Sequence, residues 1–233
     1  MRKLFGLLLM LSLGCAQANE DKMRKALEQK LGGAKVESIT KTQYGGLYEV
    51  RLENQLFYTD EKVSFVVAGS IIDLATMQNI TEERKRKLSA IDFKSLPLEL
   101  AVKTVRGDGS KVVAIFADPN CGYCKRFEKD LFKVDNVTIY TFLYPILSAD
   151  SEQKSKSVWC AKDRVKAWQD LMLKGETPMN PGTCDTPIAK IVEVGKKLRV
   201  TGTPTLYFSN GIPVGGAVSL AQLEEYLGTG GPQ

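Results

Sequence analysis

The sequence predicts an α+β protein with two domains joined by a helix. Three observations lead to this fold class. A helical pattern followed by alternating strands fills the first third of the chain, a highly charged helical segment follows, and strands and helices alternate in the remainder. A chain of 233 residues, with 43% apolar and 25% charged residues, is long enough and apolar enough for two globular domains.

The first 18 residues have the pattern of a secretory signal peptide. The basic pair Arg2–Lys3 precedes the apolar run Leu4–Leu13, which is too short to span a bilayer. Ala16–Ala18 then matches the small-residue cleavage pattern. We therefore expect cleavage after residue 18 and export of the mature chain. A lipoprotein anchor at Cys15 is a weaker alternative, because the residues before this cysteine match that pattern poorly.

Residues 19–77 are predicted to form a small helix-plus-β-meander domain. Met23, Leu27 and Leu31 recur every four residues within 19–31, as in an amphipathic helix. Residues Tyr48–Glu53 alternate between apolar and polar, as in a half-buried strand. A domain of this size has a marginal core, so we expect it to pair with a copy of itself. Further strands are expected at 56–59, 63–68 and 71–74.

Residues 78–97 are predicted to contain a linker helix. Thr81 is the expected N-cap, and Glu82–Glu83 would place two acidic side chains in the first turn, where the helix dipole favours them. The basic cluster Arg84–Lys87 is interpreted as one solvated helix face. After signal cleavage the net charge falls from +5 to about +3, which is too small to indicate a nucleic-acid partner.

Residues 98–233 are predicted to form the second domain. Val112–Phe116 is continuously apolar, as expected for a central strand covered on both faces. Asn210–Gly211 is a hairpin turn signal, and Ser219–Gln222 matches a capping box. The order β–α–β–helices–β–β–α describes a thioredoxin-like domain with a helical insertion. Strands are expected at 100–105, 111–117, 137–144, 205–209 and 212–218, and helices at 124–132, 150–174, 188–198 and 219–227.

The candidate catalytic motif is Cys121-Gly122-Tyr123-Cys124, which lies between a predicted strand and a predicted helix. The unpaired N–H groups and positive dipole at a helix N-terminus favour a thiolate at the first cysteine. A thiolate is the nucleophile of disulfide exchange. We therefore interpret Cys121 as the attacking group and Cys124, one turn later, as the resolving thiol.

Two alternatives to a redox pair remain open at this stage. Zinc binding would require a second ligand pair, which Cys160 and Cys184 could supply, although their spacing of 24 is unlike that of zinc ribbons. An inert disulfide or two buried thiols is the other alternative. The absence of histidine excludes Cys–His zinc sites, Ser–His triads and Cys–His proteases. We predict no metal and no cofactor.

A second signal is the proline of Val200-Thr201-Gly202-Thr203-Pro204-Thr205, at the start of a predicted strand. Proline cannot donate to a sheet, so an edge strand or a simple turn is the ordinary interpretation. In thioredoxin-like domains a proline at this place has a cis peptide bond and packs beside the C-x-x-C motif. The backbone before it pairs with the substrate chain.

Cys160 and Cys184 form the other cysteine pair of the mature chain. Export to an oxidising compartment permits stable disulfides. A bond between them would close a loop of about 25 residues and stabilise the fold by about 3 kcal/mol. We favour a structural disulfide over two free thiols or a second redox relay.

The sequence resembles the DsbC/DsbG family of periplasmic thiol:disulfide interchange proteins. The resemblance covers essentially the whole mature chain. It is carried by the signal peptide before that chain, the small N-terminal β domain, the linker helix, the Cys121–Cys124 motif, Trp159–Asp163 and Thr201–Pro204. It implies a homodimer through the N-terminal domains, kept reduced by a membrane thiol reductase of the DsbD type. It also implies that misfolded exported proteins with wrong disulfides are the substrates.

The same resemblance implies roles for individual residues. Cys121 is the implied nucleophile and Cys124 the implied resolving thiol. Thr203 and a cis Pro204, with Gly122 and Tyr123, are the expected substrate contacts, and the Cys160–Cys184 pair is the implied structural bond. That pair favours the DsbC branch over the DsbG branch.

The expected function is that of a periplasmic disulfide isomerase with accompanying chaperone activity. Alternatives within the same fold are a dithiol oxidase of the DsbA type and a reductase that protects single cysteines from sulfenic acid. A holdase chaperone is the alternative from a different class of function.

Overall fold

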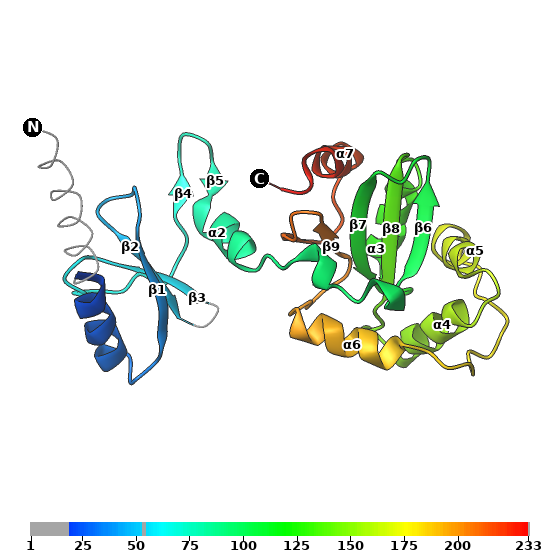
Figure 1. Ribbon diagram of the computed structural model, residues 1–233, viewed down its shortest axis with the longest axis horizontal. Helices are drawn as coiled ribbons and strands as arrows, with labels where there is room; N and C mark the ends of the chain where they lie inside the picture. The colour runs from blue at the N-terminus through cyan, green and yellow to red at the C-terminus, as the bar shows by residue number, and fades with distance from the viewer. Residues whose placement is uncertain (1–18, 53–54, 233) are drawn as a thin grey trace, which may run out of the picture. The chain divides into compact units, whose positions relative to one another are not determined.

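The computed structural model describes residues 19–52 and 55–232 and contains two compact units that meet at the bond between residues 88 and 89 (Figure 1). The predicted signal peptide, residues 1–18, lies outside the described residues. Among the described residues, no helix is both long and apolar enough to cross a membrane.

The first unit is a helix packed on a three-stranded antiparallel sheet. Met23 and Leu27, on the helix over residues 19–30, pack against Val36, Ile39 and Val50 of the sheet. Spacing of four residues puts both helix side chains on one face, which explains why this face is the buried one. The strands, in spatial order, are β1 (Val36–Lys41), β2 (Tyr48–Leu52) and β3 (Gln55–Thr59).

The meander differs from the predicted one at both ends. Strand β1 was not predicted, and the strand predicted over 63–68 is wrong. An isolated β-bridge between Tyr58 and Val67 pairs that segment with β3 in place of a strand, and Val63 has a positive φ of 54° that breaks an extended run. A separate two-stranded ribbon follows, formed by β4 (Ile72–Asp73) and β5 (Gln78–Asn79).

Helix α2 (Ile80–Leu88) is shorter than the linker helix expected within 78–97. Its first turn is capped by Asn79, whose side chain accepts a hydrogen bond from Glu82 N at 3.0 Å, so the prediction of Thr81 as N-cap is wrong. Thr81 is buried instead and shares a hydrogen bond with the hydroxyl of Tyr58. The segment after α2 contains the short 3₁₀ turns Phe93–Ser95 and Leu98–Leu100.

The second unit is built on a five-stranded sheet of order β10-β9-β7-β8-β6. Strand β7, the predicted apolar central strand, pairs in parallel with β8 and antiparallel with β9. Its side chains are buried on both faces, as the uninterrupted apolar run requires. The strands are β6 (Val102–Arg106), β7 (Lys111–Ala117), β8 (Val137–Leu143), β9 (Thr205–Phe208) and β10 (Pro213–Gly215).

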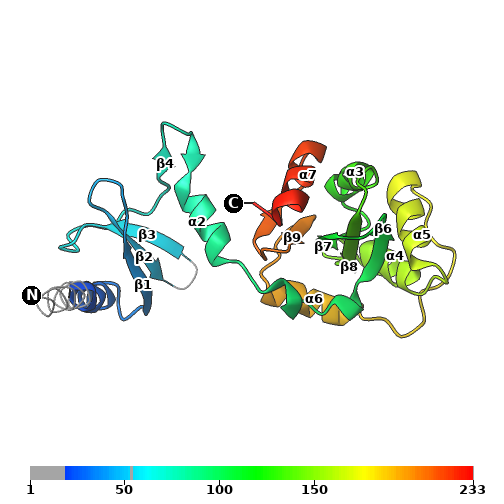
Figure 2. The same ribbon diagram turned by 45° about the horizontal axis from the view of Figure 1, so that its top comes forward.

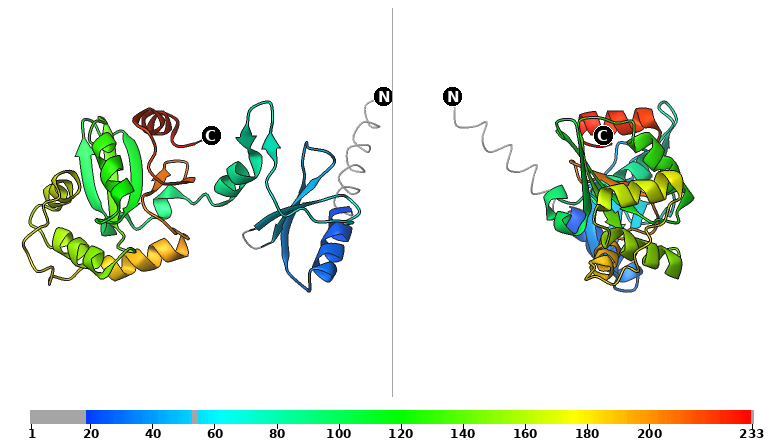
Figure 3. Two further views of the ribbon diagram at one scale, coloured as in Figure 1. Left: turned by 180° about the vertical axis from the view of Figure 1, so that it is seen from behind. Right: turned by 90° about the vertical axis from the view of Figure 1, so that its right-hand side faces the viewer.

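Helices cover both faces of this sheet (Figure 2). Helices α3 (Gly122–Leu131) and α7 (Leu220–Thr229) lie on one face, and α4 (Ala149–Trp159) and α6 (Ile188–Lys197) on the other. Seen from behind, α3 lies in front of the sheet and runs along the strands (Figure 3). The predicted capping box of Ser219 and Gln222 is present.

The predicted helical insertion is divided into three helices. After α4 come α5 (Arg164–Gln169) and a π-helical turn, Asp170–Lys174, that ends at Gly175 in the left-handed conformation. Asp163 caps α5 by accepting a hydrogen bond from Lys166 N at 2.9 Å. The cap explains why the helical pattern over 150–174 is interrupted rather than continuous.

Candidate active site

The Cys121 sulfur caps the N-terminus of helix α3. Cys121 has extended backbone angles, and its Sγ accepts a hydrogen bond from Cys124 N at 3.3 Å. The sulfur therefore occupies the position that a Ser or Asp oxygen takes at an ordinary N-cap. The unpaired N–H groups and the positive end of the helix dipole both stabilise negative charge at this atom.

Cys124 lies one turn further along α3 and faces the core. It is almost fully buried, and burial raises the pKa of its thiol, with the hydrogen bond to Cys121 as the second cause. The charge of Cys121 acts in the same direction. The two cysteines are free thiols, so the structure represents the reduced state. Burial thus disfavours ionisation of the Cys124 thiol.

The Thr203–Pro204 peptide bond is cis and lies against the cysteine pair. Cys121 Sγ donates a hydrogen bond to the carbonyl oxygen of Thr203 at 3.2 Å, across 82 residues of sequence. Pro204 comes directly before β9, which neighbours the central strand β7. The structure therefore brings Thr203 and Pro204 to the two cysteines, as the sequence order predicts.

The backbone at two glycines near the reactive cysteines, Gly122 and Gly202, borders open space. A Cβ atom added at Gly122 or at Gly202 would meet no other atom within 4 Å. Tyr123 is 62% exposed, whereas Cys121 itself is 6% exposed. Cys121 is therefore nearly buried, while the backbone at Gly122 and Gly202 borders open space.

Asp118 fixes the loop that carries Cys121, a role that the sequence did not suggest. Its carboxylate is fully buried and accepts hydrogen bonds from Asn120 N at 2.8 Å and from Ser151 Oγ at 2.8 Å. The N–H groups of Ile146 and Leu147 also donate to it, at 2.9 and 3.0 Å. Four donors satisfy a buried charge that would otherwise be costly.

Glu128, four residues after Cys124 on α3, is a second buried carboxyl for which we predicted no role from the sequence. Trp168 Nε1 donates a hydrogen bond to Glu128 Oε2 at 3.3 Å. Burial raises the pKa of Glu128 to about 7, while the bond from Trp168 and the charge of Arg106 oppose this shift. A charged residue on a helix face otherwise occupied by Phe127 and Leu131 is the signal that could have identified it.

The raised pKa makes the stability of the second unit depend on pH. Because the pKa of about 7 in the folded state exceeds the ordinary carboxyl pKa of 4.5, the folded state binds an extra proton between these pH values. Stability from the protonated Glu128 is present below about pH 4.5 and is lost as the pH rises through about 7.

We expect Glu128→Gln to stabilise the protein by about 1–2 kcal/mol at pH 8, where the substitution removes a buried charge. At pH 4.5 the Glu128 carboxyl is already neutral in the folded state, so we expect no stabilising effect there, and the amide is a new polar group that needs hydrogen-bond partners. Both tryptophans of the chain, Trp159 and Trp168, lie in the second unit, so fluorescence during urea unfolding reports this unit. Equal effects at the two pH values would contradict the assignment.

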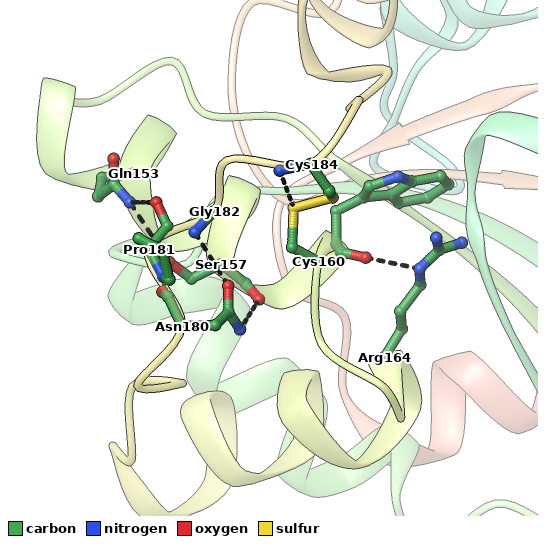
Figure 4. The surroundings of a disulfide bond; sticks show 9 residues. Gln153, Ser157, Cys160, Arg164, Asn180, Pro181, Gly182 and Cys184 are labelled. Atoms are coloured by element: carbon green, nitrogen blue, oxygen red, sulfur yellow. Dashed lines mark hydrogen bonds between the residues drawn. A yellow bond between two sulfur atoms is a disulfide. The ribbon is translucent and has the colours of Figure 1, made fainter.

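Cys160 and Cys184 are joined in a disulfide, at the end of α4 and in the loop before α6 (Figure 4). Cys184 N donates a hydrogen bond to Cys160 Sγ at 3.2 Å. Ser157 and Asn180 bond across the same loop, Ser157 Oγ to Asn180 O at 3.0 Å and Asn180 Nδ2 to Ser157 O at 2.8 Å. Because these two sulfurs bond to each other, they cannot complete a zinc site with Cys121 and Cys124.

Comparison with protein families agrees with this architecture. Residues 98–231 match the family described as thioredoxin-like domain. Residues 14–82 match the family described as disulfide bond isomerase protein N-terminal domain.

Individual relatives cover most of the chain. The "Probable thiol:disulfide interchange protein DsbC" of Bordetella pertussis is 46% identical over 207 residues, which is 89% of this chain and 74% of the relative. The "Thiol:disulfide interchange protein DsbC" of Escherichia coli is 28% identical over 218 residues, covering 92% of this chain and 89% of the relative.

Among solved structures, a disulfide interchange protein from Neisseria gonorrhoeae aligns with a TM-score of 0.57 and 41% identity, covering 59% of this chain and all of that one. The thiol-disulfide exchange protein alpha-DsbA2 of Wolbachia pipientis, 18% identical with a TM-score of 0.51, shares the fold. With a thioredoxin-like domain over more than half its length and a 46% identical relative, the chain belongs to the DsbC family of thiol:disulfide interchange proteins.

Proposed function

We propose that this protein is a periplasmic disulfide isomerase that rearranges wrong disulfides in exported proteins. The observation that carries the proposal is the placement of the Cys121 sulfur as the N-cap of α3, 3.2 Å from the Thr203 carbonyl oxygen and beside a buried second thiol. Such a pair suits a reaction in which the Cys121 sulfur attacks the substrate disulfide and the Cys124 sulfur reacts only later, with the mixed disulfide.

The reaction begins when the Cys121 thiolate attacks one sulfur of a substrate disulfide. The substrate S–S bond breaks, a Cys121–substrate disulfide forms, and the second substrate sulfur leaves as a thiolate. Another substrate thiolate then attacks the bonded substrate sulfur, which forms the new disulfide and releases Cys121 as a thiolate. No electrons are gained or lost in this sequence.

Cys124 resolves the mixed disulfide when no substrate thiol attacks it. It attacks Cys121, which releases a reduced substrate and leaves a Cys121–Cys124 disulfide that an external dithiol reductant must reduce. We assign that reduction to a membrane thiol reductase of the DsbD type. Since burial raises the pKa of Cys124, few molecules have it ionised, and the mixed disulfide survives long enough for isomerisation.

The remaining assignments extend the same proposal. Thr203, Pro204, Gly122 and Tyr123 contact the substrate beside Cys121. Residues 1–18 act as the export signal and are then cleaved. The mature protein forms homodimers through residues 19–77. Residues 78–97 link that part to the catalytic domain over residues 98–233.

Exposed apolar side chains in the first unit support the homodimer, because a unit with so small a core rarely leaves such surface uncovered. Sedimentation of the mature chain is expected to give twice the monomer mass. A monomer at micromolar concentration would contradict the assignment. These side chains are Phe65, Val66, Val67, Ile72, Leu74 and Met77.

Isomerisation is tested with scrambled ribonuclease in a glutathione buffer, where the protein is expected to restore ribonuclease activity. A Cys124→Ser variant is expected to accumulate a mixed disulfide at Cys121, detectable by non-reducing electrophoresis and mass spectrometry. An oxidase of the DsbA type would instead introduce disulfides into reduced ribonuclease and leave the scrambled protein inactive.

A further inference from the structure

We propose that Ile146 and Leu147 form an apolar contact surface for the substrate chain bonded to Cys121. Through this surface the enzyme would prefer disulfides whose cysteines are flanked by apolar residues. The inference rests on the proposed disulfide exchange at Cys121 and specifies which substrates that site favours. We call Ile146 and Leu147 the apolar pair.

The apolar pair lies directly beside the loop that carries Cys121. The N–H groups of both residues donate to the carboxylate of Asp118, and the carbonyl oxygen of Asp118 accepts a hydrogen bond from Cys121 N at 3.1 Å. Asn120, the residue before the cysteine, donates through Nδ2 to Ser148 Oγ at 3.3 Å. One buried carboxylate therefore holds the reactive loop and the apolar pair together.

The same bonds keep the apolar pair in a defined position. Asp118 is fully buried, and Ser148, the next residue after the pair, is the N-cap of α4 and accepts from Ser151 N at 3.1 Å. The backbone is thus fixed on both sides of two exposed side chains, Ile146 at 38% and Leu147 at 56% exposure. A surface ordered in advance loses less conformational entropy when it binds a chain.

The occupant follows from the chemistry at Cys121. During exchange the substrate is covalently attached to this sulfur, so the residues next to its cysteine are held near the loop that Asp118 joins to the apolar pair. The attachment makes any contact with the apolar pair intramolecular, which raises its effective concentration. Apolar side chains gain most from that contact, because burying them against Ile146 and Leu147 removes apolar area from water on both partners.

The test compares two peptide disulfides that differ only in one residue beside the cysteine, leucine in one and serine in the other, and a small uncharged disulfide such as hydroxyethyl disulfide. Reduced full-length protein and an Ile146→Ser/Leu147→Ser variant react with each. For the leucine peptide, the double variant is expected to lose about tenfold in kcat/KM. The rates with the serine peptide and the small disulfide should stay within about twofold of the unsubstituted protein.

Two matched controls accompany this comparison. Leu147→Met keeps an apolar side chain and is expected to keep the preference for the leucine peptide. Val105→Ser removes an apolar side chain of similar exposure, 54%, from β6. Val105 pairs with Thr138 near the start of β8, whereas the apolar pair follows the end of β8, so this control lies at the opposite end of that strand. This control is expected to leave all three rates unchanged.

The outcomes separate the inference from the function on which it rests. An unchanged leucine preference in the double variant would overturn the inference, and so would an equal loss on all three disulfides, which would mean that the pair only supports the cysteine loop. If the unsubstituted protein reacts with the small disulfide but never isomerises scrambled ribonuclease, the proposed isomerase function fails while the preference can still be measured.

Discussion

Replacing Cys121 with alanine is expected to reduce the isomerisation of scrambled ribonuclease to the rate of the glutathione buffer, a loss of at least about a hundredfold. Cys121 supplies the sulfur that forms the mixed disulfide, and Cys124 cannot replace it. The Cys124 thiol is buried, and its raised pKa leaves little thiolate to attack a substrate.

The Cys124→Ser variant is the matched control for this experiment, because it removes a sulfur from the same motif but leaves the nucleophile in place. It is expected to keep measurable isomerisation and to form the trapped intermediate. Full activity of Cys121→Ala would refute the mechanism. If Cys121→Ala lacks isomerase activity but still suppresses aggregation of an unfolded protein, chaperone activity exists separately from the thiols.

The second large effect is expected from removing the disulfide between Cys160 and Cys184. The double variant Cys160→Ala/Cys184→Ala should be less stable by about 3 kcal/mol, because the bond closes a loop with a sequence separation of 24 and restricts the unfolded chain. For the second unit, this corresponds to a decrease in Tm of roughly 10 °C, followed by tryptophan fluorescence.

Thiol chemistry at Cys121 should be unaffected in the folded fraction of this variant. Hydrogen bonds of Ser157, Asn180 and Gln153 still hold the loop against α4, including Gln153 Nε2 to Pro181 O at 2.8 Å. The rate with hydroxyethyl disulfide at 20 °C is therefore expected to match that of the parent protein. A large decrease in that rate would indicate that the bond takes part in the redox chemistry and is not only structural.

Much of the second unit follows from local sequence signals. The run Val112–Phe116 predicted the central strand, and the capping box at Ser219 predicted the start of the last helix; both are confirmed. Asn79 shows the limit of such signals. Either Asn79 or Thr81 is an acceptable cap by residue type, and Thr81 is buried because its hydroxyl bonds to Tyr58 on a strand distant in sequence.

By itself, the sequence determined the fold class, the place of Cys121 at a helix start and the family to which the chain belongs, because these depend on periodicity, spacing and short motifs. Only the tertiary structure decided the roles of Asp118 and Glu128. Asp118 gains its importance from donors near residues 146–151, and Glu128 from burial beside Trp168. Burial and the partners of a carboxylate are set by segments far apart in the chain, and no local pattern records which of them will meet.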